Sequence, residues 1–413
     1  MLKLQPHLLN GARQAGELVN ALGISRVTLM NAYQREANQL LRLGRARTTH
    51  YAARRMVTGL TTDEFPTFRV DDTGQIVRAG TLITLAGDET VWLPDQTIVD
   101  GLPAEMHDIA PLGFLGRSYA QHHADLGLPD DVSDWSDHHV LIALSRRGED
   151  LPGNLIIGRE SFGRFQNLRH NTHTVADFPA LSMAALAGEH VGSSAGGEQP
   201  KFTALVDDQH RLVKFATSQT DNARRWQDLL TLEHTALETL RNAGIPAAET
   251  TLQDINGLRC LIINRFDRIG INGRRAVITL AAASGRTGIP WTDAAEELER
   301  DDLLSSNDSQ RISLLDAFGA LIANTDRNLY NILLYPTETG YTIAPAFDQL
   351  PMAYAPPASG NIRNSAINTP RPTVNTLATW DDARTLANEF WQRASKQRLS
   401  DSMQAIVTAH ITR

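Results

Sequence analysis

The chain has 413 residues, of which 42% are hydrophobic and 21% are charged, and its formal net charge is −8. This is the composition of an ordinary soluble protein, and the length predicts two or three domains. No apolar run approaches the roughly 20 residues that cross a bilayer, and the first residues lack the apolar core of a signal peptide. We therefore expect a cytoplasmic protein with no membrane partner. The single cysteine, Cys260, excludes an internal disulfide bond.

Positive charge is concentrated at the start of the chain. Residues 1–57 contain nine arginines and lysines against Glu17 and Glu36, a surplus of +7, and because the whole chain sums to −8 the remainder carries −15. Such asymmetry predicts a basic module that meets a polyanion, joined to an acidic body that does not.

Within this basic segment the pattern predicts two helices and a hairpin. Residues 15–22 form the first helix, Gly23 breaks it, and Ser25 caps a second helix that runs to about Asn38. Its packing candidates are Val27, Met30, Ala32 and Tyr33. Residues 40–43 and 48–53 then alternate as strands around a basic turn.

This order predicts a winged helix-turn-helix domain over residues 1–60 that binds double-stranded DNA. The candidate DNA-binding residues are Arg26, Thr28, Asn31, Arg35, Arg45 and Arg47. A helical hairpin used for dimerisation is the alternative, and a homodimer stays open.

The next segment alternates with a period of two. Short runs between residues 65 and 94 are separated by Asp-Asp-Thr-Gly and Ala-Gly-Asp turns, which predicts an antiparallel meander. Residues 137–145 read as a helix, and residues 151–158 return to strand.

A glycine-rich stretch, residues 191–205, comes next. Its small residues let backbone N–H groups turn toward phosphate oxygens, and Lys201 and Lys214 on the following strands supply positive charge. It is not a Walker A loop, because Glu198 and Gln199 stand where Lys and Ser or Thr are required. A plain glycine-rich hairpin is equally favoured at this point.

The features that follow keep the linear order of a two-lobed kinase. A periodic helix over residues 224–242 carries Glu233, which can meet the strand lysine, and a buried strand from Arg259 leads into a hinge-like segment. Asp326 then stands five residues before Asn331, and Asp348 follows a short strand signal, the inventory of a phosphoryl-transfer site. Turn formers and helix caps are the alternative for each residue taken alone.

Together these residues resemble the HipA-type serine/threonine kinase toxins. The resemblance covers about residues 65 to 410, and it rests on residues 194–201, 213–215, 264–268, 324–331 and 344–348, with Leu151-Pro-Gly-Asn-Leu155 as a companion. It implies an α+β, two-lobed protein-kinase-like fold, with a β-rich lobe at 61–263 and a mainly helical lobe at 264–413. It also implies ATP and Mg²⁺ as cofactors and a protein substrate.

The resemblance assigns a role to each matching position. Asp326 is the expected catalytic base, Asn331 and Asp348 the metal ligands, and Lys214, supported by Glu233, the phosphate-binding lysine. The loop expected over the phosphates contains Ser194, Ala195, Gly196, Gly197, Glu198, Gln199 and Lys201. The residues expected at adenine are Asn264, Arg265 and Phe266. Ser194 is the expected self-phosphorylation site.

Two departures from the family are visible. Members commonly have His two residues after the catalytic Asp, and Lys or Gly before the Asn, where this chain has Asn328 and Tyr330. Typical members also lack a basic leader. Our first interpretation is a toxin-like serine/threonine kinase with a DNA-binding module, and the alternative is a transcriptional regulator with a nucleotide-sensing, catalytically weak body. Retention of Asp326, Asn331, Asp348 and Lys214 favours the enzyme.

Overall fold

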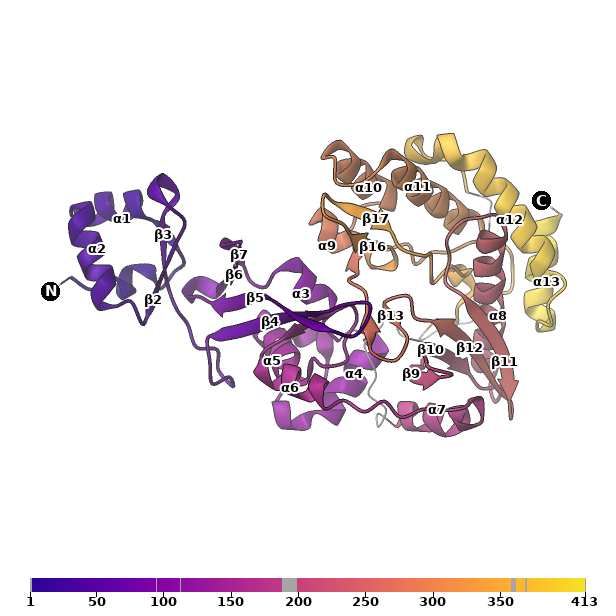
Figure 1. The fold of residues 1–413 in the computed structure, drawn as a ribbon. Helices are drawn as coiled ribbons and strands as arrows, with labels where there is room; N and C mark the ends of the chain where they lie inside the picture. The colour runs from indigo at the N-terminus through magenta and orange to yellow at the C-terminus, as the bar shows by residue number, and fades with distance from the viewer. Residues whose placement is uncertain are drawn as a thin grey trace.

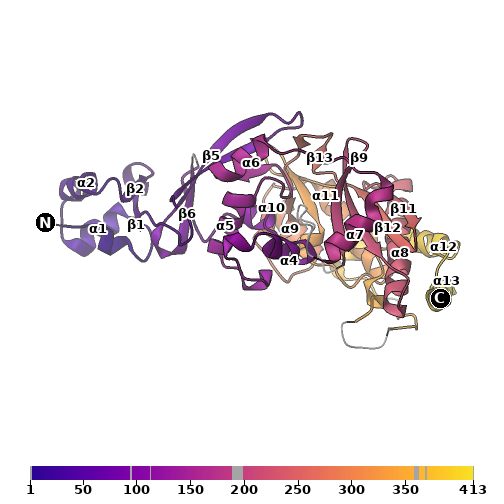
Figure 2. The same ribbon diagram turned by 90° about the horizontal axis from the view of Figure 1, so that it is seen from below.

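The computed structural model describes residues 2–93, 95–111, 113–187, 199–357, 362–367 and 370–412. The chain builds an N-terminal module (residues 2–54), a middle region (residues 64–166) and a C-terminal body (residues 175–412), and the two termini lie at opposite ends of the molecule (Figures 1 and 2). None of the described helices combines the length and apolar character that a membrane span needs.

The N-terminal module packs two helices on a small sheet. Its elements are η1 (Gln5–Leu8), β1 (Arg13–Gln14), α1 (Ala15–Leu22), α2 (Arg26–Arg35), β2 (Leu40–Leu43), η2 (Ala46–Thr48) and β3 (His50–Ala53), with strand order β1-β3-β2. Gly23, at a left-handed φ of 62°, closes α1, and the Ser25 hydroxyl accepts a hydrogen bond from the Thr28 N–H to begin α2. Leu18 and Leu29 meet in the core beneath the two helices.

The two predicted helices and the hairpin are therefore confirmed, with two corrections. Helix α2 ends at Arg35, because the backbone of Glu36 leaves the helical conformation (φ −114°, ψ 16°), and the Glu36 carboxylate accepts hydrogen bonds from the N–H groups of Leu4 and Gln5. Val27 is 69% exposed and is not a packing residue. It lies two residues before the buried Leu29, which places it on the opposite face of the helix.

The middle region is an antiparallel sheet with helices packed against it. Its strands are β4 (Glu64–Val70), β5 (Ile76–Thr84), β6 (Glu89–Leu93), β7 (Thr97–Asp100) and β8 (Leu155–Ile157), in the order β7-β6-β5-β4-β8. Its helices are α3 (Ala104–Asp108), α4 (Gly113–His122), α5 (Asp137–Arg147) and α6 (Arg159–Gln166). The predicted meander, helix and returning strand are all present, and the region has its own apolar core.

The first half of the C-terminal body is a four-stranded sheet. It contains α7 (Phe178–Leu186), β9 (Lys201–Val206), β10 (Gln209–Ala216), α8 (Asp221–Asn242), β11 (Thr250–Ile255) and β12 (Leu258–Asn264), with strand order β11-β12-β10-β9. Helix α8 lies against this sheet, and Lys214 of β10 stands directly opposite Lys201 of β9.

The second half is mainly helical. Its helices are α9 (Leu280–Ser284), α10 (Trp291–Arg300), α11 (Ser306–Leu321), η7 (Leu329–Asn331), η9 (Val374–Thr379), α12 (Trp380–Ala394) and α13 (Asp401–Ile411). Its strands are β13 (Arg268–Ile269), β14 (Gly273–Arg274), β15 (Ile278–Thr279), β16 (Leu333–Pro336) and β17 (Tyr341–Ile343).

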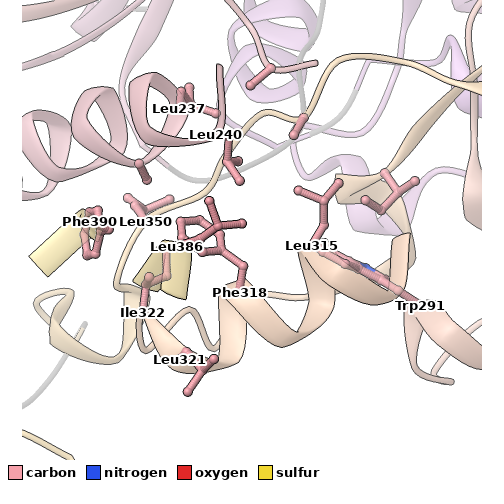
Figure 3. Close-up of a cluster of buried hydrophobic side chains, with 14 of the residues drawn as sticks. Leu237, Leu240, Trp291, Leu315, Phe318, Leu321, Ile322, Leu350, Leu386 and Phe390 are labelled. Carbon is pink, nitrogen blue, oxygen red and sulfur yellow. The ribbon is translucent and has the colours of Figure 1, made fainter. Parts of the chain in front are cut away.

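One apolar core joins the two halves. Figure 3 shows Leu237 and Leu240 of α8 above Phe318 of α11, with Leu386 and Phe390 of α12 beside them. Polar contacts extend this attachment along α8. The Asp228 carboxylate accepts hydrogen bonds from Ser400 at the start of α13, and Arg225 donates to the carbonyl oxygen of Arg363. Helix α8 is therefore fixed to the helical half as well as to the sheet.

Polar contacts also join the three parts of the chain. The Ala12 N–H donates to the Glu89 carboxylate at 2.7 Å, which ties the N-terminal module to the middle region. Arg268 donates to the carbonyl oxygens of Leu151 and Gly153, which ties the body to the middle region. The Leu151-Pro-Gly segment thus serves as a seam between the middle region and the body.

Candidate active site

A buried lysine joins two carboxylates at the centre of the site. The Nζ atom of Lys214 lies 2.7 Å from an oxygen of Glu233 and 2.5 Å from Oδ1 of Asp348. The side chains of Lys214 and Glu233 are 6% and 0% exposed, so both charges are removed from water and depend on each other. The predicted pairing of a strand lysine with a helix glutamate is confirmed.

The three groups perturb one another. Burial acts to lower the pKa of Lys214, but the Asp348 and Glu233 carboxylates outweigh it and hold that pKa above its usual value. Burial likewise acts to raise the pKa of Asp348, and the neighbouring Lys214 and Lys201 outweigh it, so the pKa of Asp348 is lowered and the group stays ionised. Asp348 also has a left-handed φ of 54°, a conformation that non-glycine residues rarely adopt and that is concentrated at functional sites.

The loop that carries Asp326 is held by its own amides. The Asn328 side chain donates to Oδ1 of Asp326 at 2.7 Å, and the Asn331 side chain donates to the Asp326 carbonyl oxygen at 2.8 Å. Asn324, which is 1% exposed, accepts from the Asp326 N–H and donates to the Asp348 carbonyl oxygen at 3.4 Å. These contacts fix the Asp326 carboxylate relative to the Asp348 segment.

A cavity of about 360 Å³ collects these groups. Lys201, Lys214, Glu233, Asn264, Arg265, Phe266, Asp326, Asn331 and Asp348 all line it, so the fold brings these nine predicted residues together. Gln199 does not line it, although its side chain is largely buried. Five predicted loop residues, Ser194, Ala195, Gly196, Gly197 and Glu198, lie outside the described residues.

The hinge-like segment closes one wall of the cavity. The Asn264 side chain turns away to donate to Glu249, and Arg265 is paired with Asp267 at 2.6 Å. Phe266 packs near Phe347, with ring centroids 6.0 Å apart. The segment thus offers the cavity an aromatic surface, whereas its polar side chains and the N–H groups of Asn264 and Arg265 are engaged elsewhere.

The middle region supplies a wall that the sequence did not indicate. Asp108, Ile109, Ala110 and Pro152 all line the cavity. Asp108 accepts hydrogen bonds from the N–H and the hydroxyl of Thr279, at 2.6 and 2.8 Å. Burial raises the pKa of Asp108 to about 6, and the two Thr279 hydrogen bonds oppose that rise. Of these residues only Pro152 carried a signal, as part of the Leu-Pro-Gly-Asn-Leu motif.

The oxygen donors fit a magnesium ion better than a metal held wholly by protein. No cluster of three His, Cys, Asp or Glu side chains occurs in the part of the chain that the structure describes. Mg²⁺ is usually held by one or two carboxylates together with phosphate oxygens and waters. Asp348 and Asn331 line the same cavity, and the amide oxygen of Asn331 can ligate a metal while its nitrogen is bound to the Asp326 carbonyl.

Comparison with known proteins identifies families that match two segments of the chain and one relative that matches nearly all of it. Residues 193–411 match the family described as the HipA-like C-terminal domain, and residues 61–166 match that described as the middle domain of YjjJ-like toxins. Toxin YjjJ of Escherichia coli strain K12 is 34% identical over 432 aligned positions, which cover 98% of this chain and 96% of that protein.

One solved structure supports the fold. A chain from the complex of HipA, HipB and operator DNA of the Shewanella oneidensis MR-1 toxin–antitoxin system superposes with a TM-score of 0.55 at 15% identity, covering 84% of this chain and 95% of that chain. The proinflammatory kinase CtkA of Helicobacter pylori gives a TM-score of 0.36 at 12% identity over 51% of this chain and 88% of its own, which is too low to support an argument. The α+β, kinase-like fold, the matching C-terminal domain family and the toxin relative all point to the same family. The chain belongs to the HipA-type toxin family.

Proposed function

We propose that this chain is a toxin kinase that transfers the γ-phosphate of ATP, with Mg²⁺, to a serine or threonine hydroxyl of a protein. The observation that carries the proposal is the Lys214 bridge between Glu233 and Asp348, in the same cavity as Asp326 and Asn331. Positioning and electrostatic stabilisation dominate phosphoryl transfer, and this cavity offers a fixed cation, a candidate base and oxygen ligands.

Each residue has a distinct task in this proposal. Asp326 accepts the proton of the acceptor hydroxyl as its oxygen bonds to the γ-phosphorus and the bond to the bridging oxygen breaks, releasing ADP. Lys214 holds phosphate oxygens, and Asp348 with the Asn331 amide oxygen would hold Mg²⁺. The metal would neutralise charge that develops on the phosphates. Asn328 keeps one Asp326 oxygen occupied, which leaves the other for the acceptor.

The N-terminal module is proposed to bind duplex DNA. Arg26, Thr28, Asn31, Arg35, Arg45 and Arg47 are all exposed, on α2 and at the turn between β2 and β3. An exposed polar helix face flanked by basic residues is the arrangement that reads a groove and its phosphates.

A nucleotide-sensing regulator without phosphate transfer is the second candidate. The observation that favours it is the Asn328 hydrogen bond to Asp326, since the family commonly has His at that position. Self-phosphorylation at Ser194 belongs to the kinase proposal alone, and mass spectrometry of the expressed protein beside its Asp326→Ala variant tests it.

The decisive experiment separates the two carboxylates. Asp348→Ala should abolish transfer of ³²P from ATP and weaken Mg²⁺-dependent ATP binding, because it removes the charged metal ligand. Asp326→Ala should abolish transfer but keep ATP binding, measured by calorimetry, because its task is to orient the nucleophile. A folded Asp326→Ala protein that binds no ATP would overturn the assignment, and an active one would overturn the mechanism.

A further inference from the structure

A second cavity adjoins the first at the Asp326 loop. It has a volume of about 690 Å³ and lies between that loop, the start of α10, helix α11 and the start of η9. Asp326, Asn328 and Tyr330 line both cavities. A group bound in the second cavity would therefore lie beside the proposed base, which the proposed nucleotide cavity also reaches.

The charge of this groove is negative. Its charged lining residues are Asp293, Asp316, Asp326 and Arg327. Arg327 is paired with Asp316, at 2.9 Å between Nε and Oδ1. Asp293 accepts a hydrogen bond from the neutral side chain of Asn375, and within the described ranges neither it nor Asp326 forms a salt bridge. The groove therefore keeps two uncompensated carboxylates, which repel a nucleic acid and attract a cationic side chain.

Val374, an exposed apolar residue, lies at one edge of the groove on a segment that is held in place. Val374 is 91% exposed, yet its element is fixed: the Ser313 hydroxyl donates to the Asn375 carbonyl oxygen, and the Asn375 amide donates to Asp293. Tyr330, which is 50% exposed, lies on the loop side. Rigid exposed apolar side chains at a cavity edge lose little entropy on binding and commonly serve as contact points.

We propose that this groove binds the acceptor segment of a protein substrate, an extended stretch whose serine or threonine is flanked by lysine or arginine and by an aliphatic residue. The inference rests on the proposed kinase function and names its substrate class. The cationic side chain faces Asp293, the aliphatic residue packs on Val374, and the hydroxyl enters the passage at Asp326.

Binding of two peptide pools to the full chain tests the proposal. Both pools are fluorescein-labelled with a central serine and aliphatic neighbours, and they differ only in carrying Lys and Arg or Asp and Glu. Anisotropy is measured with Mg²⁺ and a non-hydrolysable ATP analogue. The basic pool should bind at least about tenfold more tightly than the acidic pool. Equal affinity, or preference for the acidic pool, overturns the proposal.

Matched variants locate the binding. Asp293→Lys should weaken the basic pool about tenfold, whereas Glu296→Lys, the same charge change on an exposed face of α10, should stay within about twofold. Val374→Ser should weaken it severalfold because the apolar contact is lost without a change of charge, compared with Leu377→Ser on the same helix outside the groove. Because Val374 is almost wholly exposed, its substitution leaves the fold intact. If Asp293→Lys fails to fold, the Val374 variant therefore tests the groove on its own. Equal effects of site and control variants overturn the groove.

Phosphate transfer from labelled ATP to the same pools keeps the two proposals apart. Basic peptides that bind in the groove but receive no phosphate count against the kinase and leave the groove standing. Equal transfer to both pools overturns the proposed role of the groove and supports the proposed kinase activity. Duplex DNA binding that changes with Asp293→Lys but not with Glu296→Lys would show that the groove serves a nucleic acid, which overturns the proposal.

Discussion

The N-terminal module and the active-site cavity use charge in opposite ways. In the module, Arg26, Arg35, Arg45 and Arg47 are exposed to water, and salt screens each of them separately. In the cavity, Lys214 is buried between Glu233 and Asp348, so that each charge is costly without the others. Changes in the cavity should therefore be close to all-or-none, whereas changes in the module should be graded and salt-dependent.

Not every arginine in residues 1–57 is a free surface charge. Arg54 forms salt bridges with Asp63 and Glu64, and Arg55 forms one with Asp88, so both point back to the middle region. The surplus of +7 at the start of the chain thus overstates the charge that the module can present to DNA.

The largest effect is expected from Lys214→Met. Removing the cation leaves the buried Glu233 carboxylate unpaired beside the partly exposed Asp348 carboxylate, so the free energy of unfolding should fall by about 3 to 5 kcal/mol and phosphate transfer should be lost. Urea denaturation and a transfer assay measure the two effects.

A double variant, Lys214→Met with Glu233→Leu, separates stability from chemistry. It should recover part of the lost stability, because apolar residues of similar volume replace the buried Lys214–Glu233 pair while the Asp348 carboxylate still lacks its cation, yet it should stay inactive. Recovery of activity would show that the lysine serves only the fold.

The next effect concerns the hold on Asp326. Asn328→Ala removes the amide that binds Oδ1, and because misplacement of a reacting group costs on the order of 100-fold, kcat should fall by about that factor with ATP affinity unchanged. Asn328→His, the residue common in the family, should restore part of the rate. An unchanged kcat in Asn328→Ala would mean that the amide does not position the base.

Asp108 is a third case, because its half-buried carboxyl group is bound by the neutral Thr279 and not by a cation. Its pKa of about 6 lies above the unfolded value of about 3.9, so between these pH values the native state binds more protons and stability falls as pH rises. From pH 4 to pH 7 the protein should lose about 2 to 3 kcal/mol relative to Asp108→Asn. Parallel pH profiles of the two proteins would refute the assigned pKa.

The smallest and most graded effect belongs to the module. Arg45→Ala with Arg47→Ala should weaken duplex binding modestly and make the log–log salt dependence shallower, by about 0.9 for each phosphate that an arginine no longer neutralises. Arg384→Ala, an exposed arginine of α12, is the control. An equal fall in affinity in the control would place the DNA site elsewhere.

The sequence predicted the residues whose signal is local. The Asp326-to-Asn331 spacing, the lysine in an alternating strand and the glutamate on a periodic helix can each be read within one element. The Asp108 wall could not be read, because its contact with Thr279 spans 171 positions and depends on how the middle region packs on the body. Val27 was assigned to the core from its apolar side chain, although the helical period puts Leu29 there instead.

The fixed position of α8 limits how the proposed activity could be regulated. The helix carries Glu233, and it is bound by Ser400 through Asp228 and by the core shared with α12. An outward swing of α8 would have to break that core, so an inactive state made by rotating this helix would cost much of the stability of the body. Control is easier to exert by blocking access to the cavity. Removal of the C-terminal helices would loosen α8 and so disturb the Lys214–Glu233 ion pair.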